Sequence, residues 1–336
     1  MNSKFLNLIK SPITIFILIM ILTPIFISNK YYINVLVLAM ITCIATLGFR
    51  LIQLTGHLSL AQGVFIGIGA YTSVTLVGIF GISFWAAMPL AGVVAAIIGL
   101  IIAWPALRLK GAYFAILTLG LSEVFRVILL NFWSFSGGPS GIPGGETTIE
   151  SIPRPENILF INFSSRIAYF YLVLIVLIIV VLIFNKMDKS TTGKTIDAIR
   201  QSDDLALSIG INVIGYKMNA FIIACFFTGI SGALLAHYLN SITPGDFNFW
   251  KSSDIVLFSL IGGLGNILGP IVGVIGMTIL SNSVASFAQY QSIIYGVVAI
   301  IFIMLLPDGL VGIPKLIKSI LIKIIKNKKN NLNRGD

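Results

Sequence analysis

Side chains that carry out covalent or acid–base chemistry are scarce in this sequence. It holds two histidines, His57 and His237, and two cysteines, Cys43 and Cys225. None of them has a second histidine or cysteine nearby at the spacing of a metal site, and both cysteines lie in apolar runs. An enzyme needs an acid, a base, a nucleophile or a metal cluster gathered in one place. We therefore expect no catalytic residue and no metal site on this chain.

One short motif imitates a nucleotide site. Gly193-Lys194-Thr195 resembles the end of the phosphate-binding loop G-x-x-x-x-G-K-[ST]. The first glycine of that motif would stand at position 188, where this chain has Asp188. The motif also follows a strand in nucleotide-binding domains, whereas here it follows a long apolar run. We expect no ATP site on this chain.

Polar side chains inside apolar runs are the remaining candidates. Glu123 and Arg126 lie three residues apart, on one face of a helix. Ionisable groups at such positions are functional candidates. Two interpretations stay open: contacts to the ammonium or carboxylate of a zwitterion, or a neutralised structural pair. Hydroxyl, amide and glycine positions in a second region would line a pathway if backbone is exposed there. This second set is Ser59, Gln62, Gly63, Gly67 and Tyr71 in the predicted span 57–80, and Thr118 of the predicted span 111–131 is a further pathway candidate.

The elements that position these residues are membrane spans. Of 336 residues, 57% are hydrophobic and 10% are charged, against about 25% charged in soluble domains. This composition excludes a soluble or disordered chain and predicts an all-α polytopic membrane protein, since runs of about 20 apolar residues cross a bilayer as helices. We predict about ten transmembrane segments, at 12–29, 31–53, 57–80, 82–104, 111–131, 166–185, 217–239, 253–264, 267–285 and 290–306.

The basic residues set the orientation. The net charge is +10, and most of the excess lies in a tail at 315–336 and near the amino terminus, at Lys4 and Lys10. Cytoplasmic segments of membrane proteins carry this excess, so both termini are expected inside, and nucleic-acid binding is not. The loop 186–216 is also expected to be cytoplasmic. An even number of crossings must then separate it from the tail, which requires a helix break at Gly262-Gly263-Leu264-Gly265-Asn266. The transmembrane domain would cover 1–314.

Glycines hint at an internal repeat. Gly56, Leu58, Gly63 and Gly67 have the same spacing as Gly262, Leu264, Gly269 and Gly273. Many transporters are built from repeats. The direction of the second copy relative to the first stays open.

The loop 186–216 predicts a short helix. Ser202 can cap it, Asp203 and Asp204 suit its first turn, and Gly210 can end it. Leu205 and Ala206 would follow within it, and Thr195 to Arg200 would form another turn. Such a helix could dock in a groove of a soluble partner or lie on the bilayer. A Gly- and Pro-rich outer loop at 132–165 would dock a soluble protein or simply be solvated.

Several motifs together resemble the branched-chain amino acid ABC transporter permeases, and they run in order from about residue 31 to 312. The chain is most similar to the larger of the two permease subunits that pair in that family. The motifs are Gly56-His57-Leu58-Ser59-Leu60-Ala61-Gln62-Gly63 with Phe65 to Thr72, Leu107 to Ile116 with Thr118-Leu119-Gly120 and Glu123 to Arg126, Ser136 to Ile142, Asp203 to Asn212, Gly262 to Asn266, and Pro307-Asp308-Gly309-Leu310.

The resemblance implies an importer subunit with an ABC permease-type bundle and glycine-broken helices, in the bacterial cytoplasmic membrane. Its implied partners are a second permease subunit in a heterodimer, two ATP-binding subunits, an extracytoplasmic binding protein and membrane lipids. ATP and Mg²⁺ would be bound by the ATPases, with no cofactor on this chain. Asp203, Asp204, Leu205, Ala206 and Gly210 would form the ATPase-coupling loop, although a clear Glu-Ala-Ala is missing from it.

Other functions stay open. Ala61 stands where a glycine is common in the family, and relatives that carry urea or other small polar solutes share much of the pattern. A self-sufficient secondary transporter or channel would need ion-coupling carboxylates deep in the spans, where Glu123 is the one good candidate. A membrane enzyme is disfavoured by the missing acid–base cluster.

Overall fold

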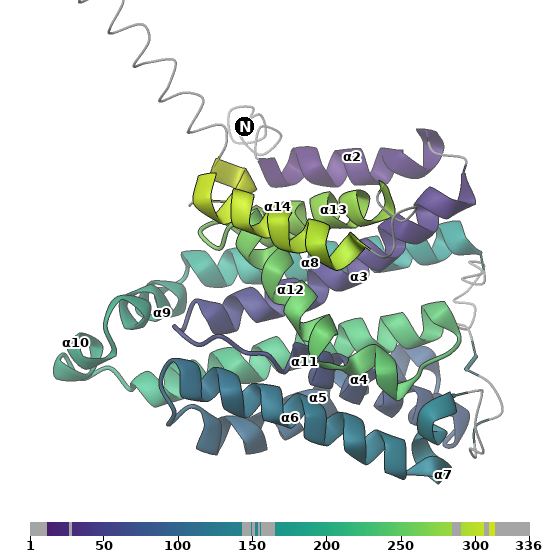
Figure 1. Cartoon of the computed structure of the whole chain (residues 1–336), viewed down its shortest axis with the longest axis horizontal. Coiled ribbons are helices and arrows are strands. Elements are labelled where there is room, and N and C mark those ends of the chain that lie inside the picture. The colour runs from purple at the N-terminus through teal and green to yellow at the C-terminus, as the bar shows by residue number, and fades with distance from the viewer. Residues whose placement is uncertain are drawn as a thin grey trace, which may run out of the picture. The chain divides into compact units, whose positions relative to one another are not determined.

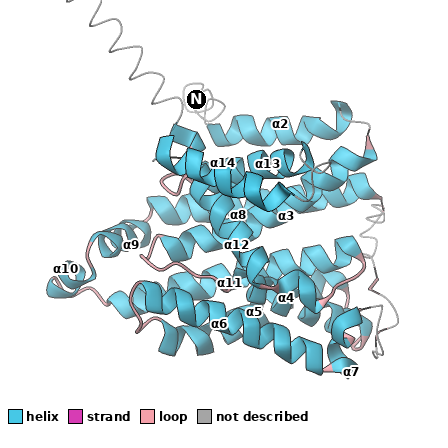
Figure 2. Cartoon of the chain, viewed as in Figure 1, coloured by secondary structure: helices cyan, strands magenta, loops and turns pink. Residues whose placement is uncertain are grey.

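The computed structural model describes residues 12–26, 29–142, 149, 152–153, 155, 165–283, 290–305 and 309–312. Within these residues every regular element is a helix (Figures 1 and 2). The α-helices are α2 (Pro12–Phe26), α3 (Lys30–Gln53), α4 (Gln62–Gly78), α5 (Phe84–Ala106), α6 (Ala112–Asn131), α7 (Trp133–Ser136), α8 (Arg166–Lys189), α9 (Thr191–Gln201), α10 (Asp203–Ser208), α11 (Val213–Leu239), α12 (Phe249–Gly262), α13 (Leu268–Ser283) and α14 (Gln291–Leu305). The 3₁₀ turns are η1 (Gly138–Ser140), η2 (Pro244–Phe247) and η4 (Leu310–Gly312).

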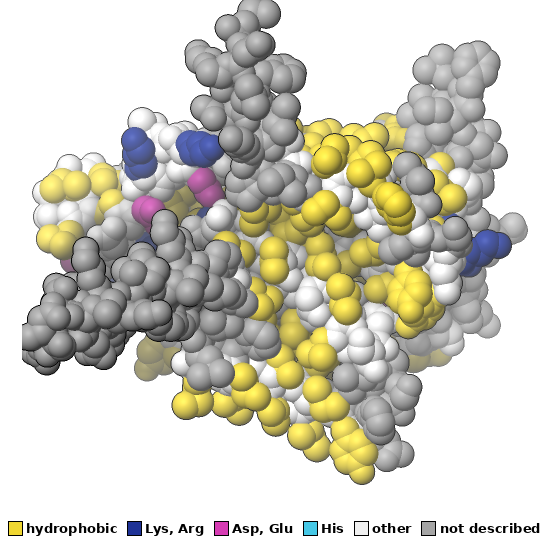
Figure 3. Space-filling view, turned by 90° about the horizontal axis from the view of Figure 1, so that it is seen from above, with side chains coloured by type: hydrophobic (Ala, Val, Ile, Leu, Met, Phe, Trp, Pro, Cys, Tyr) yellow, Lys and Arg dark blue, Asp and Glu magenta, His cyan; other side chains and the backbone are white. Residues whose placement is uncertain are grey.

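The prediction of an all-helical polytopic membrane protein is confirmed. Five of the described helices are long and apolar enough to cross a membrane, namely α3, α5, α6, α8 and α11. Two further apolar helices, α4 and α13, are shorter. Apolar side chains cover much of the visible face, and most of the visible charged side chains gather toward one end (Figure 3). The count of ten crossings and their orientation stay predictions.

The chain forms two compact units, Met1–Val256 and Leu257–Asp336. In the first unit α11 packs against α3, α4 and α5, and glycines permit the closest approaches. A Cβ on Gly232 would lie 1.9 Å from the carbonyl oxygen of Ile66, and one on Gly69 would lie 2.0 Å from the carbonyl oxygen of Gly229. Lipid gives no hydrophobic drive for helix association, so backbone-to-backbone packing at small residues replaces it.

The start of α4 corrects one predicted span. The predicted crossing at 57–80 begins in the structure at Gln62, and residues 54–61 are a non-helical connection after α3. The physical reason is that side chains from other helices bind the backbone of this connection. The hydroxyl of Thr118 accepts a hydrogen bond from the Leu60 N–H at 3.0 Å, and the hydroxyl of Ser122 donates one to the Leu60 carbonyl at 2.8 Å. The apolar composition of the span does not reveal these hydrogen-bond partners, so it could not predict where the helix begins.

The second unit confirms the predicted helix break. Helix α12 ends at Gly262 and α13 begins at Leu268. A Cβ on Gly269 would lie 1.7 Å from the Gly263 carbonyl oxygen, and one on Gly309 would lie 2.4 Å from the Gly263 nitrogen. Gly263 itself has φ +97°, which L side chains rarely adopt.

The two predicted repeat copies share this break. Gly56, like Gly262, lies six residues before the first residue of the helix that follows it, Gln62 of α4 in one case and Leu268 of α13 in the other. The spacing seen in the sequence therefore corresponds to the same local structure: a helix break followed by a glycine-packed helix.

Several predicted features lie outside the described residues. These are Lys4 and Lys10, the basic tail 315–336, and most of the outer loop between 143 and 164. The predicted domain boundary at 314 and the role of the outer loop therefore stay predictions.

Candidate functional site

The α9–α10 loop is a capped, ordered unit. The Ser190 hydroxyl accepts a hydrogen bond from the Gly193 N–H at 3.3 Å and caps α9. The Ser202 hydroxyl accepts one from the Leu205 N–H at 3.3 Å and caps α10. Gly210 has φ +83° just after α10, which favours glycine. The predicted second helix, its cap and its glycine stop are confirmed, and the first turn predicted at 195–200 is an 11-residue helix.

A small apolar core fixes the two short helices to the bundle. Ile199 of α9, Ala206 of α10 and Val213 of α11 are buried together, with Ile211 and Tyr216 packed against them. A helix of six residues is unstable alone, so α10 depends on this packing. The loop is therefore positioned by the end of α11 rather than by its own helix propensity.

Ion pairs add three further links from this loop and the end of α8 to the rest of the unit. Lys217 Nζ of α11 lies 2.6 Å from Asp203 Oδ2, and the Lys217 side chain is 6% exposed. Asp188, at the end of α8, lies 2.9 Å from the buried Arg50 of α3. Asp204 lies 3.7 Å from Lys110, but both side chains are largely exposed, so this pair contributes little.

The face of the loop that points away from the core is apolar. Leu205 is 70% exposed, and Leu207 and Ile209 are exposed as well. Figure 1 shows α9 and α10 projecting from the ends of the long helices. Three exposed branched side chains on a fixed, capped unit form a surface suited to a groove of another protein. The Asp203 and Asp204 carboxylates lie at the beginning of α10, at its positive dipole end.

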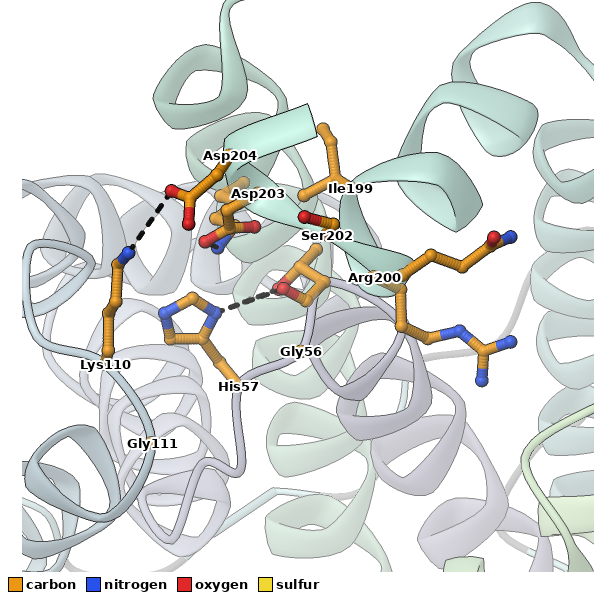
Figure 4. Close-up of a pocket in the computed structure, with 12 residues that line it drawn as sticks. Gly56, His57, Lys110, Gly111, Ile199, Arg200, Ser202, Asp203 and Asp204 are labelled. Carbon is orange, nitrogen blue, oxygen red and sulfur yellow. Dashed lines mark hydrogen bonds and ion pairs between the residues drawn. The ribbon is translucent and has the colours of Figure 1, made fainter. Parts of the chain in front are cut away.

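A polar cavity of about 330 Å³ lies behind α10 (Figure 4). Its walls come from three connections: Thr55, Gly56 and His57 before α4; Lys110 and Gly111 before α6; and the segment from Ile199 to Asp204, closed by Lys217. The coupling residues predicted from the sequence therefore meet the connection that precedes the predicted pathway. Sequence reasoning did not place Lys110 or Lys217 beside them, because Lys110 comes from the connection before α6 and Lys217 from α11.

His57 is a buried titratable group of this cavity, as Lys217 is. Its Nδ1 lies 3.2 Å from the Thr55 carbonyl oxygen, and its ring packs edge-on against Phe114. Its Nε2 is buried without a hydrogen-bond partner among the described residues. Burial lowers the pKa of His57 below its usual value, and the nearby positive charge of Lys217 lowers it further.

Four of the predicted pathway residues come together at the start of α4. Gln62 and Gly63 begin the helix, Ser59 lies just before it, and Thr118 reaches the same segment from α6. All four lie in the buried interior of the first unit. The structure therefore brings Thr118 beside the start of α4, and the role of these four residues in transport stays a prediction.

Other helices complete this segment with three polar residues absent from the predicted set. The Ser252 hydroxyl accepts a hydrogen bond from the Gly63 N–H at 2.8 Å, and the Thr228 hydroxyl donates one to Gln62 Oε1 at 3.0 Å. Ser122, described above, is the third. One signal was present in the sequence: Thr118 and Ser122 are four residues apart on one helix face.

Gly67 and Tyr71 lie further along α4, against a different cluster. A Cβ on Gly67 would meet Phe125 and Phe247. The Tyr71 ring packs against Phe247 and Phe135 with centroid distances of 5.8 Å. These two residues are buried within an aromatic cluster, separate from the Ser59–Thr118 group.

Glu123 and Arg126 lie apart from both groups. Arg126 Nε donates to both Glu123 carboxylate oxygens, at 3.0 and 3.1 Å, and Nη2 donates to Oε1. Both side chains are on a part of α6 that the rest of the first unit leaves uncovered. The structure joins the two as an ion pair and does not bring them to the other candidates.

His237 has a structural environment. Its two ring nitrogens lie 2.9 Å from the Ser73 hydroxyl and 2.7 Å from the Pro153 carbonyl oxygen. Asn240, in the left-handed conformation at the end of α11, donates to the Ile152 carbonyl. These contacts attach two residues of the outer loop to α4 and α11.

Long apolar helices packed through glycine define a helical membrane protein. The family of permease components of branched-chain amino acid transport systems matches residues 31–306. This chain belongs to that family.

Relatives agree with this assignment. The high-affinity branched-chain amino acid transport system permease proteins LivM of Salmonella typhimurium and Escherichia coli are each 30% identical over 308 residues, covering 85% of this chain and 71% of theirs. A probable branched-chain amino acid transport permease protein LivH of Methanocaldococcus jannaschii is 26% identical, covering 84% of this chain and 90% of its own. No solved structure matches the chain.

Proposed function

We propose that this chain is a permease subunit of an ATP-driven, binding-protein-dependent importer of branched-chain or related aliphatic amino acids. Membership of the family and the names of the LivM and LivH relatives support transport of this substrate class. In this proposal the chain pairs with a second permease subunit, two separate subunits bind and hydrolyse ATP, and an extracytoplasmic protein delivers the amino acid.

The single observation that carries the coupling proposal is the construction of the α9–α10 loop. It presents Leu205, Leu207 and Ile209 outward on a capped unit, and Asp203 joins it to α11 through the buried Lys217. A loop transmits the movement of an ATPase only when it moves together with the spans to which it is attached. The apolar core at Ile199 and the ion pair provide that attachment.

The topology follows from the same assignment. With ten crossings and both termini in the cytoplasm of a bacterium, the α9–α10 loop faces the ATPase subunits. The five long apolar helices and the positive-inside distribution of charge support this orientation. The connection between α3 and α4 would then open toward the cytoplasm, and its cavity lies directly behind the coupling helix.

The translocation pathway is proposed to pass the broken segment at 54–61. Non-helical backbone at membrane depth is tolerated where it is buried in protein or lines a water-filled cavity. Movement of α10 against the cavity walls would change the packing of this segment, because Gly56 and His57 line the same cavity. Alternating access would follow if the hydrogen bonds from Thr118 and Ser122 to the Leu60 backbone are present in one of the inward-open and outward-open states and broken in the other.

Reconstitution tests the function. The chain is purified with the second permease and ATPases encoded beside it, placed in proteoliposomes, and supplied with the binding protein and radiolabelled leucine. Uptake should require ATP, the ATPases and the binding protein. Uptake by this chain alone, driven by an ion gradient, would instead establish a secondary transporter.

The substrate is tested separately. Leucine, isoleucine and valine should compete for uptake, whereas urea should not. Competition by urea and no effect of the aliphatic amino acids would assign the chain to a carrier of small polar solutes while leaving the ATP-driven mechanism intact.

A further inference from the structure

Helix α6 has one covered face and one uncovered face. Its buried residues are Phe114, Thr118, Ser122 and Leu129, which all fall on one side. On the opposite side Ile116, Gly120, Glu123 and Val127 recur at intervals of four, three and four residues and are all exposed. We name these four residues the outer α6 stripe.

The outer α6 stripe carries charge at the middle of a span. Helix α6 has 20 residues, so at 1.5 Å per residue it is about 30 Å long, the thickness of a bilayer core. Glu123 is its twelfth residue and Arg126 its fifteenth, so at 1.5 Å per residue they lie about 12 Å and about 8 Å from the end of the helix, and Glu123 lies near the middle of the span. Charged side chains there face protein or water, since lipid solvates them poorly.

The other charged residues on the described long spans all lie within about a turn of a helix end, and two of them are buried. Arg50 and Lys217 are buried, lie within about a turn of a helix end, and pair with Asp188 and Asp203 of the same chain. On these helices the Glu123–Arg126 pair thus combines mid-span depth with exposure. In the membrane, protein outside the first unit or water must therefore solvate this pair.

Gly120 gives the stripe its shape. A Cβ built on Gly120 would have nothing within 4 Å, whereas Gly69 and Gly232 each touch a neighbouring backbone of the same unit. The glycine is therefore not needed for packing inside the chain. Between Ile116 and Glu123 it leaves a notch in which another helix can approach closely, as small residues do at helix interfaces in membranes.

We infer that the outer α6 stripe is the surface through which this chain packs against the second permease subunit. The occupant is a membrane-spanning helix of that subunit, with a small or apolar face against Ile116, Gly120 and Val127 and a polar group opposite the ion pair. The inference rests on the proposed function, which requires a paired permease. It goes further by naming the helix face through which the two permeases make contact. Because Glu123 and Arg126 then lie at a subunit boundary, they border the space between the two permeases.

Site-specific photo-crosslinking in the assembled transporter tests this inference. A benzoylphenylalanine is placed at Ile116 or Val127 in the stripe, and at Ile101 of α5 or Ile175 of α8 as exposed controls. Illumination should join the second permease to the two stripe positions and not to the controls. Co-purification of the second permease with the unmodified chain is measured in the same preparation.

A substitution provides the second measurement. Gly120→Trp fills the notch and should remove most of the co-purified second permease while the amount of this chain in the membrane stays the same. Ile101→Trp, which also adds bulk at an exposed position, should retain the partner. Both variants add an apolar side chain that lipid accepts.

The outcomes separate the inference from the proposed function. Two results would overturn the interface assignment and leave the importer proposal standing, provided that the second permease co-purifies. In the first, the stripe positions form adducts only with lipid or within the chain itself. In the second, Gly120→Trp keeps its partner. If no second permease co-purifies with the unmodified transporter, both are overturned.

Discussion

Removing the carboxylate of Asp203 tests whether the α10 helix is attached to the spans through Lys217. In Asp203→Asn, the Lys217 ammonium loses the charged partner that lies 2.6 Å away while its side chain remains 6% exposed. Breaking a buried pair from one side costs about 3–5 kcal/mol. The Asp203 side chain is 23% exposed, so the lower end applies, about 3 kcal/mol. This corresponds to about a hundredfold shift away from the docked position of α10.

The matched control is the neighbouring residue. Asp204 has the same charge and lies in the same helical turn, but its pair with Lys110 is long and exposed. Asp204→Asn should cost less than about 1 kcal/mol. In proteoliposomes holding the complete transporter, Asp203→Asn should lose most amino-acid uptake, whereas Asp204→Asn should keep it. The amount of each variant in the membrane is measured in parallel.

A double variant separates charge from position. Asp203→Leu combined with Lys217→Met removes both charges, and apolar replacement of a buried pair is often neutral or stabilising. Uptake should recover relative to Asp203→Asn. Equal uptake by Asp203→Asn and Asp204→Asn, or a double variant no better than the single one, would refute the role assigned to this ion pair.

Three further predictions concern the interior. Gly232→Ala should prevent close packing of α4 on α11, because its Cβ would lie 1.9 Å from a carbonyl oxygen of α4. We expect the free energy of unfolding of the purified chain, measured by thermal unfolding, to fall by about 1–3 kcal/mol. Gly296→Ala, at a glycine with open space, should match the parent. Thr118→Val removes the acceptor of the Leu60 N–H and should cost about 1–3 kcal/mol by the same measurement, with Thr118→Ser retaining most of the stability. His57 has a lowered pKa in the folded chain, so as the pH falls the unfolded chain binds a proton at this histidine before the folded chain does. The stability of the folded chain should therefore decrease below about pH 6.5 and be independent of this group above it. His57→Gln should flatten that pH dependence, and an unchanged slope would contradict the buried neutral state.

Short-range features of the coupling loop were predictable because their causes are local. Ser202, the two aspartates after it and Gly210 are close in sequence, and a hydroxyl cap and a left-handed glycine act within one or two turns. The break at Gly262 was found by combining glycine content with the charge of distant loops. Glycine content and charge did not predict where α4 begins, because the hydrogen bonds that keep residues before Gln62 out of the helix come from Thr118 and Ser122 of another helix.

The pathway candidates show the same division. The sequence selected Ser59 and Gln62 for their hydrogen-bonding groups in an apolar run, and the fold brings Thr118, a further candidate, to the same place. It also selected Tyr71, which packs in an aromatic cluster, and Glu123, which lies on an uncovered helix face. Polarity identifies an unusual side chain, but the rotation of its helix decides what that side chain meets.

The sequence alone determined the all-helical membrane class of the protein and its family, since apolar run length and ordered motifs are properties of the chain itself. The tertiary structure decided which charges are buried and which partners they have. Lys217 and Asp203 are 14 residues apart, and Arg50 and Asp188 are 138 apart. The energy of such a pair depends on distance and on exclusion from water, and both are set only when helices from separate parts of the chain pack together.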